Sequence, residues 1–117
     1  MTSDDARRLA LSLPEAAEEP HHDLPSFRVR GRIFATLPDD GHLRVMAGEP
    51  EILAAVAEDP EACAPFFWGK RLACVVVDLA KVHPGLLEEL LIEAWLRKAP
   101  KSLAASSGLD ARRSRPV

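Results

Sequence analysis

The chain has 117 residues, which suits one domain, and 47% of them are hydrophobic, which is enough to form a core. This content excludes disorder throughout, and no run approaches the roughly 20 apolar residues that cross a membrane. The formal net charge is −3 and the pI is near 5.8, so the chain as a whole lacks the basic footprint expected of a nucleic-acid-binding protein.

The charges are spread unevenly. Residues 26–37 carry three arginines and no acid, whereas residues 38–63 carry seven acidic residues and one arginine. A basic band on an acidic body steers anions toward it. The same pattern also fits a solvated strand face that binds nothing, so both interpretations stay open.

A helix is expected over residues 3–12, because Ser3 is a suitable N-cap and two aspartates follow it at the positive end of the helix dipole. Its buried stripe is formed by apolar residues at helical spacing, namely Ala6, Leu9, Ala10 and Leu13. The sequence pattern of residues 16–47 predicts an antiparallel meander, with strands over 17–22, 26–30, 32–37 and 42–47. Gly31 separates the two middle strands, and Pro38-Asp39-Asp40-Gly41 is a strong turn signal before the last strand.

A short second helix is expected over residues 50–58. Pro50 suits its first position, and its apolar side is formed by Ile52, Leu53, Val56 and Ala57. Residues 61–71 favour a loop or bulge, with at least two of the aromatic residues 66–68 in the core.

The remaining segments are a strand, a helix and a tail. Residues 72–79 are apolar and β-branched, which predicts a central strand covered on both faces. Residues 84–98 form the clearest helix, with Arg97 and Lys98 at the negative end of its dipole. Residues 101–117 are small, polar and basic, which predicts a mobile tail.

This order of elements defines a fold class. Strands in one layer and helices in the other make an α+β two-layer sandwich, an antiparallel sheet with helices packed on one face. We expect a single domain over residues 1–100, followed by the tail over residues 101–117.

Anion binding is the sharpest chemical expectation. A continuous strand places Arg28, Arg30 and Arg32 on one face, and phosphates are natural ligands for such a face. Lys70 and Arg71 extend the band if the two strands are neighbours, and Trp68, with Phe67, can stack on exposed bases. The candidate nucleic-acid or anion-binding residues are therefore Arg28, Arg30, Arg32, Trp68, Lys70 and Arg71. Arg112, Arg113 and Arg115 would add nonspecific phosphate contacts.

Catalytic and metal chemistry find little support. His21 and Asp23 share a strand face, but two ligands do not close a metal site. No serine lies in a nucleophile elbow, and Gly69-Lys70 lacks the glycine spacing of a phosphate-binding loop. We therefore expect no enzyme activity, no metal and no cofactor.

The cysteines and the N-terminus bear on location. Cys63 and Cys74 do not form a redox motif and fit free thiols in a reducing cytoplasm, where such residues act as small buried hydrophobes. The acidic N-terminus lacks the apolar stretch of a signal peptide. We expect a cytoplasmic monomer with no membrane association.

Several separated motifs, spread over residues 7–103, resemble the MmcQ/YjbR family of small bacterial proteins. They are Ala10-Leu11-Ser12-Leu13-Pro14, Pro25-Ser26-Phe27-Arg28-Val29, Gly31-Arg32-Ile33-Phe34-Ala35, Trp68-Gly69-Lys70, Val77-Asp78-Leu79 and Glu93-Ala94-Trp95. The resemblance implies a CyaY-like (frataxin-like) fold. The family is commonly labelled DNA-binding, with a double-wing description of its strand-rich face.

The residues and the resemblance together favour weak binding of DNA or another polyanion through the basic strand face. The alternative is an adaptor that binds a protein or a small ligand in a cleft beside the Trp68 segment and has no nucleic-acid role. Aromatic and arginine residues are enriched at such interfaces.

Overall fold

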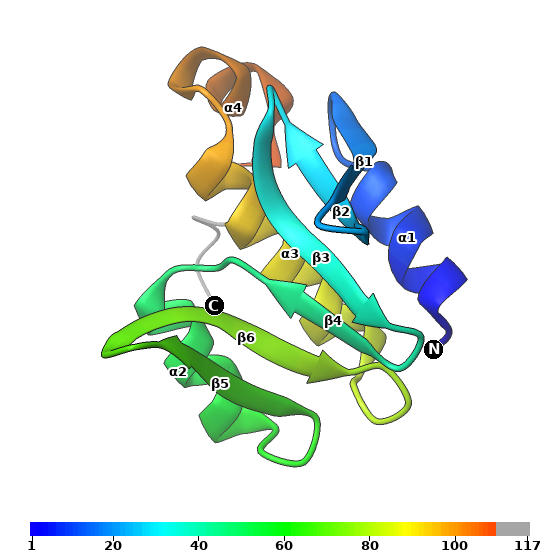
Figure 1. Ribbon diagram of the computed structural model, residues 1–117. Coiled ribbons are helices and arrows are strands. Elements are labelled where there is room, and N and C mark those ends of the chain that lie inside the picture. Colours follow the sequence, from blue (N-terminus) through cyan, green and yellow to red (C-terminus); the bar gives the residue numbers. More distant parts are fainter. Residues whose placement is uncertain (110–117) are drawn as a thin grey trace.

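The computed structural model describes residues 1–109, and the helices and strands in this range form two layers (Figure 1). In chain order they are α1 (Ser3–Leu11), β1 (Ala16–His21), β2 (Leu24–Val29), β3 (Arg32–Asp39), β4 (His42–Val45), α2 (Glu49–Glu58), β5 (Cys63–Trp68), β6 (Arg71–Asp78), α3 (Pro84–Lys98) and α4 (Lys101–Ser107).

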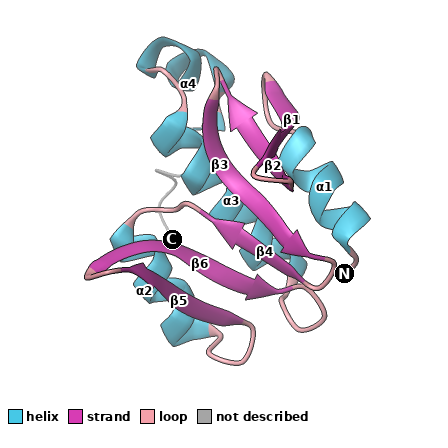
Figure 2. Cartoon of the chain, viewed as in Figure 1, coloured by secondary structure: helices cyan, strands magenta, loops and turns pink. Residues whose placement is uncertain are grey.

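The six strands form one antiparallel sheet in the order β1-β2-β3-β4-β6-β5 (Figure 2). Because β4 is antiparallel to both β3 and β6, those two strands run in the same direction and begin at the same end of the sheet. α3 packs on β3 and β4, α2 packs on β5 and β6, and α1 lies beside β1 and α3. The expected α+β two-layer sandwich is confirmed.

The core lies between the sheet and α3. One cross-strand row faces the helices and is fully buried over the four central strands, where it is made of Phe27, Ala35, Val45 and Val75. Trp95 of α3 is 0% exposed, and its indole Nε1 donates a hydrogen bond to the Pro14 carbonyl at 2.9 Å. This bond joins α3 to the segment between α1 and β1, 81 residues away.

The opposite side of the sheet, which we call the open face, carries the alternate side chains. Its central row is made of Ser26, Thr36, Arg44 and Val76. α2 and α3 lie behind the sheet when it is viewed from this side (Figure 1). The open face therefore carries polar side chains at its centre, of which Ser26 and Thr36 are buried.

The cap of the first helix differs from the prediction. The N-cap is Thr2, not Ser3: Thr2 Oγ1 accepts from the Asp5 amide, and the Thr2 amide donates to the Asp5 carboxylate. A threonine followed three residues later by an acidic side chain forms a reciprocal capping box, which satisfies two backbone donors where Ser3 would satisfy one.

The segment over residues 61–71 was expected to be a loop or bulge with at least two of its three aromatic residues in the core. It contains β5, an edge strand with a bulge at Phe66/Phe67, and the expected core position of the aromatic residues is wrong. Phe66 is half-buried, Phe67 is 54% exposed and Trp68 is 72% exposed. Each edge strand carries a proline, Pro20 in β1 and Pro65 in β5, which is the position in a sheet that proline tolerates.

Three other expectations change in detail. β6 is not covered on both faces, because it is second from the edge and Val76 on its open side is half-buried. α2 buries Ile52 and Ala55, while Leu53 is 50% exposed. Part of the predicted tail forms α4, in which Ala104 is buried, and residues 110–117, with the three tail arginines, lie outside the described residues.

Trp95 is the side chain whose loss should cost the fold most. We expect Trp95→Phe to lower the free energy of unfolding by about 2–4 kcal/mol, because it removes buried volume and leaves the Pro14 carbonyl without its donor. Urea denaturation measures the effect. Trp68→Phe is the matched control and should change stability by less than about 0.5 kcal/mol, because Trp68 is exposed. Equal effects in the two variants would contradict this account of the core.

Candidate anion-binding site

The turn between β5 and β6 presents three of the predicted site residues together. Trp68 pairs with Arg71 across the hairpin, and Gly69 and Lys70 form its turn. Gly69 has φ of +64°, the left-handed region that a two-residue hairpin turn of type II′ requires at its first position. Trp68, Lys70 and Arg71 are all exposed, so the hairpin carries an aromatic ring and two cations into solvent.

Topology brings further cations to the same end of the sheet. Arg32 begins β3 and Arg71 begins β6, and these two strands start at the same end. The last turn of α3 also lies there, because the Arg32 guanidinium donates to the Lys98 carbonyl at 3.3 Å. Arg97 donates to the carbonyls of Met46 and Ala47, both at 3.3 Å. We call this group of side chains the basic end: Arg32, Lys70, Arg71, Arg97 and Lys98.

The cations of the basic end lie close enough together to lower the pKa of Lys98. Burial lowers the pKa of the Lys98 ammonium group, and the charges of Arg97, Arg32 and Arg71 lower it further. Within residues 1–109, ion pairs are formed by Arg7, Arg8, Arg30 and His42, and none involves the basic end. Within residues 1–109, the five cations of the basic end therefore form no direct ion pair with a carboxylate.

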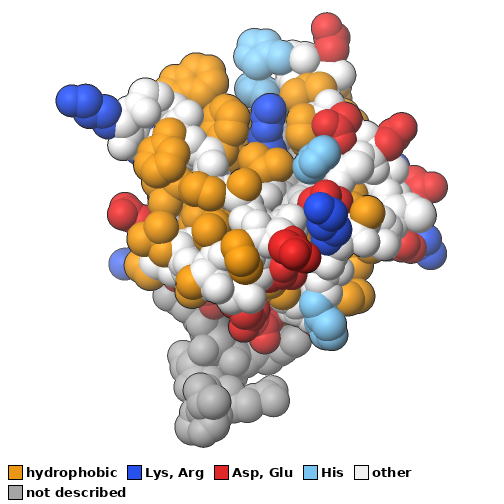
Figure 3. Space-filling view, turned by 90° about the horizontal axis from the view of Figure 1, so that it is seen from below, with side chains coloured by type: hydrophobic (Ala, Val, Ile, Leu, Met, Phe, Trp, Pro, Cys, Tyr) orange, Lys and Arg blue, Asp and Glu red, His pale blue; other side chains and the backbone are white. Residues whose placement is uncertain are grey.

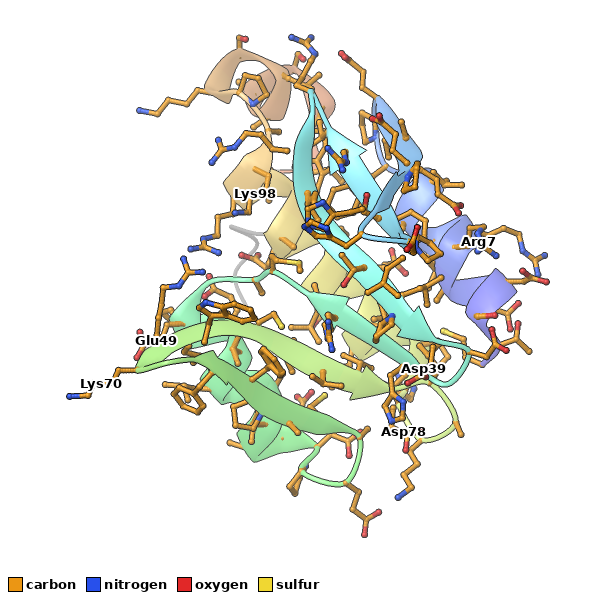
Figure 4. The ribbon with its side chains drawn as sticks, viewed as in Figure 1. Arg7, Asp39, Glu49, Lys70, Asp78 and Lys98 are labelled. Atoms are coloured by element: carbon orange, nitrogen blue, oxygen red, sulfur yellow. The ribbon has the colours of Figure 1, made fainter. Side chains whose placement is uncertain are left out.

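The other end of the sheet is acidic. Asp39 ends β3 and Asp40 follows it, Asp78 ends β6, and the Asp59–Glu61 segment precedes β5. Figure 4 shows Lys70 and Lys98 on one side of the molecule and Asp39 and Asp78 on the other. Glu49, at the start of α2, is an acidic residue on the basic side. The net charge of −3 is therefore the sum of a basic end and an acidic end, which lie at opposite ends of the strands.

The three arginines of the predicted band do not share a face. Arg30 and Gly31 form the β2–β3 turn with φ of +50° and +78°, so the strand is not continuous through them. Arg30 makes a bidentate pair with Glu15 at 2.6 and 3.0 Å. Hydrogen bonding from Arg30 lowers the pKa of the Glu15 carboxyl. Arg30 is therefore engaged within the protein.

Arg28 and Arg32 lie on opposite sides of the sheet. Arg28 alternates with the buried Phe27 and Val29, so it is on the open face, and its Nε donates to Ser26 Oγ at 3.1 Å. Arg32 pairs with Val29 and reaches the C-terminus of α3. Of the six predicted site residues, the structure places Arg32, Trp68, Lys70 and Arg71 at one end of the sheet. Arg30 lies in the turn at the same end but is paired with Glu15, and Arg28 lies on the open face.

Sequence reasoning missed Arg97 and Lys98 as members of the site. They were interpreted only as cations suited to the end of a helix, and their hydrogen bonds and charges reach β3 and the β4–α2 loop. The signal that could have found them is that the start of β3, the start of β6 and the end of α3 lie at the same end of the sheet. This signal can be used only when the strand order is known.

An apolar cavity of about 350 Å³ lies between α1 and α3, away from the predicted residues. It is lined by Leu9, Ser12, Leu13, Pro14, Glu88, Leu91, Ile92 and Leu109. Leu109 is the last residue that the structure describes. The cavity contains none of the six predicted site residues and is not part of the candidate site.

Metal and thiol chemistry can be examined directly. Within residues 1–109, no group of three or more His, Cys, Asp or Glu side chains is placed to hold a metal ion. Cys63 and Cys74 are both free and buried, and they lie on opposite faces of the sheet because Cys63 pairs with Val77. Burial raises the pKa of the Cys63 thiol to about 11, with further contributions from Asp59 and Glu58. No described helix is long and apolar enough to span a bilayer.

The fold and the motifs that position this site define a known class of proteins. The YjbR family profile matches residues 11–97, so the chain belongs to the YjbR family, as the resemblance in its sequence predicted.

Individual relatives share the whole domain. The chain is 32% identical to the uncharacterized protein Rv2570 of Mycobacterium tuberculosis and to the uncharacterized protein Mb2600 of Mycobacterium bovis, over 87% of this chain and 92% of each relative. Among solved structures, protein DR2400 of Deinococcus radiodurans, with a DUF419 domain, superimposes with a TM-score of 0.70 over 93% of this chain and 86% of that chain. At 22% identity this likeness establishes the fold alone.

The proximity of the basic-end cations can be tested by titration. We expect Arg32→Gln to raise the pKa of Lys98, because removing a neighbouring positive charge favours the protonated ammonium group. NMR titration of the lysine side chains measures the shift. Lys81→Gln, at the acidic end, removes the same charge and should leave the pKa of Lys98 unchanged. An unaltered pKa in Arg32→Gln would show that the two groups do not interact.

The thiols provide a second test. At pH 8 we expect neither Cys63 nor Cys74 to react with a disulfide reagent in the folded protein, because both are buried and burial raises the pKa of each thiol. Both should react after unfolding in guanidinium chloride. Rapid modification of either cysteine in the native protein would show that β5 or β6 opens readily.

Proposed function

We propose that this protein binds single-stranded nucleic acid at the basic end, and that it acts as a binding protein and not as an enzyme. The observation that carries the proposal is Trp68, which is 72% exposed beside a group of cations without carboxylate partners. Neighbouring exposed aromatic side chains, here Phe67 and Trp68, are typical of interaction sites.

The cations suit a phosphate backbone. Arg32, Arg97 and Lys98 come from β3 and α3, while Lys70 and Arg71 come from the hairpin, so the charges extend over more than one element. The hydrogen bonds from Arg32 and Arg97 to carbonyls use few of the five donors of each guanidinium, which leaves donors for phosphate oxygens.

The aromatic side chains favour single strands over a duplex. Trp68 and Phe67 are both exposed at the end of β5, and bases that are not paired can stack on such rings. In a duplex the faces of the bases are already stacked on one another. The separation of charge along the strands would turn the basic end, and not the acidic one, toward the ligand.

A protein partner is the second candidate, because Leu53, Phe67 and Trp68 are exposed apolar side chains on α2 and β5, which pack together. Tryptophan and arginine are enriched at the centres of protein interfaces. A pull-down distinguishes the two candidates. A partner that is recovered repeatedly after nuclease treatment favours the protein interface, whereas partners that disappear with nuclease favour nucleic acid.

Fluorescence anisotropy with labelled single-stranded and double-stranded DNA tests the proposal. We expect single strands to bind more tightly and log Kd to rise steeply with log salt concentration, because phosphate contacts release counterions. Trp68→Ala should weaken binding about tenfold, the loss of one stacked base. Arg71→Gln should reduce the salt slope by roughly 0.7, which is one phosphate contact.

Two comparisons make the experiment decisive. Lys81→Gln removes one positive charge at the acidic end and should leave both the affinity and the salt slope unchanged. Stability measured by urea denaturation shows that each variant is folded. An affinity that does not depend on salt, or equal losses in Lys81→Gln and Arg71→Gln, would refute binding at the basic end.

A further inference from the structure

Lys98, in the last turn of α3, is a half-buried lysine whose surroundings disfavour its charged form. Burial lowers the pKa of its ammonium group, and the charges of Arg97, Arg32 and Arg71 lower it further. The charges that act on Lys98 are therefore all positive. A lysine that gives up its proton more readily is more often a free amine, which is the nucleophilic form.

Three elements bring these positive charges to Lys98. Arg97 precedes it in α3, and Arg32 of β3 donates a hydrogen bond to its carbonyl at 3.3 Å. Arg71 begins β6, at the same end of the sheet as the start of β3. Arg97 is held in turn by two carbonyls of the β4–α2 loop, both at 3.3 Å. The surroundings of Lys98 are thus built by hydrogen bonds and by the strand order.

Carboxylates do not offset these charges. Neither Lys98 nor the three arginines form an ion pair with a carboxylate of the part of the chain that the structure describes. Glu49 begins α2 on the same side of the molecule (Figure 4) and Lys101 begins α4, but neither is among the charges that act on Lys98. Elsewhere the arrangement differs, because several basic side chains on the side drawn in Figure 3 lie against acidic ones.

Arg71 is the arginine of this group that is most available to a ligand. Arg32 and Arg97 already donate to carbonyls, whereas the Arg71 side chain makes no hydrogen bond or ion pair with residues 1–109. Arg71 is also exposed, and its charge acts on Lys98. A guanidinium pairs with a phosphate through two parallel N–H donors. A ligand that reaches Lys98 can therefore place a phosphate against Arg71.

We propose that Lys98 is a reactive amine that forms an imine with an aldehyde carrying a phosphate group, and that Arg71 binds this phosphate. The neutral amine attacks the carbonyl carbon, and the π electrons of the carbonyl move to its oxygen. A proton passes from nitrogen to oxygen to give a carbinolamine, which loses water to form the imine. One water is released for each imine formed, and the step is reversible and involves no oxidation or reduction.

An aldehyde close to a phosphate occurs in two kinds of ligand. One is a small sugar phosphate in its open form, and the other is a DNA strand that has lost a base. Both offer a carbonyl and a phosphate a few atoms apart, so Lys98 and Arg71 recognise them by the same chemistry. The reaction with a small aldehyde requires no nucleic acid, so this proposal and nucleic-acid binding at the basic end can fail separately.

Reductive trapping with the full chain tests the proposal. The protein is incubated near pH 8 with glyceraldehyde 3-phosphate or with glyceraldehyde, and sodium cyanoborohydride converts each imine to a stable amine. We expect one main adduct, located at Lys98 by peptide mass spectrometry. Its yield at low aldehyde concentration should be about tenfold higher with the phosphorylated aldehyde, the contribution of one hydrogen bond to a charged group. Lys98→Arg should abolish this adduct, whereas Lys101→Arg, the matched control, should leave it unchanged.

Two variants separate the roles of the arginines. Arg71→Gln should remove most of the preference for the phosphorylated aldehyde. Arg32→Gln should slow the trapping of glyceraldehyde near pH 8 and move the pH profile of the rate to higher pH, because removing a positive charge raises the pKa of Lys98. At high pH, where both amines are neutral, its rate should equal that of the natural chain. A merely structural role of Arg32 would slow trapping at every pH.

A single-stranded oligonucleotide with one abasic nucleotide identifies the source of the aldehyde. A higher yield with this strand than with glyceraldehyde 3-phosphate indicates DNA, and the reverse indicates a small metabolite. Adducts that follow exposure, at Lys70, Lys81 and Lys101, would overturn the proposal, as would equal trapping of the two small aldehydes. DNA binding in the anisotropy experiment without an adduct would overturn this proposal alone. An adduct without DNA binding would overturn only the proposed function.

Discussion

The packing of α3 against a single face of the sheet is the constraint on which the other features depend. Trp95 lies fully buried at this contact and also holds the segment that leads into β1. Because side chains alternate along a strand, each strand residue that packs against α3 has neighbours whose side chains lie on the opposite face of the sheet. The open face, with Thr36 between Ser26 and Arg44, is therefore a consequence of how the core is built.

Elements with a strong periodic pattern could be predicted from the sequence. Residues 84–98 were expected as a helix and form α3 with those bounds, because its leucines repeat at helical spacing and Pro84 suits its start. The hairpin at Gly31 was also foreseen, since few residues other than glycine adopt its φ of +78°. The hairpin at Asp40-Gly41 was foreseen from its run of turn-forming residues. These signals are local, and the order of the strands does not alter them.

Features that depend on distant contacts could not be predicted. β5 was missed because Pro65 and the bulge at Phe66/Phe67 hide its alternation, and an aromatic run resembles a core when its position at the edge is unknown. The arginine band did not form, because the turn that Gly31 permits also includes Arg30. The basic end joins Arg32 to Lys98, 66 residues away, so it follows from topology.

The prolines of the two edge strands have a consequence for the protein at high concentration. Pro20 and Pro65 interrupt the row of amide donors that each outer strand would offer to another chain. A strand from a second molecule cannot continue the hydrogen-bonding ladder past these points, so the sheet resists growth into fibrillar aggregates at either side. Phe67 and Trp68 can therefore remain exposed beside Pro65 without making β5 a template for self-association.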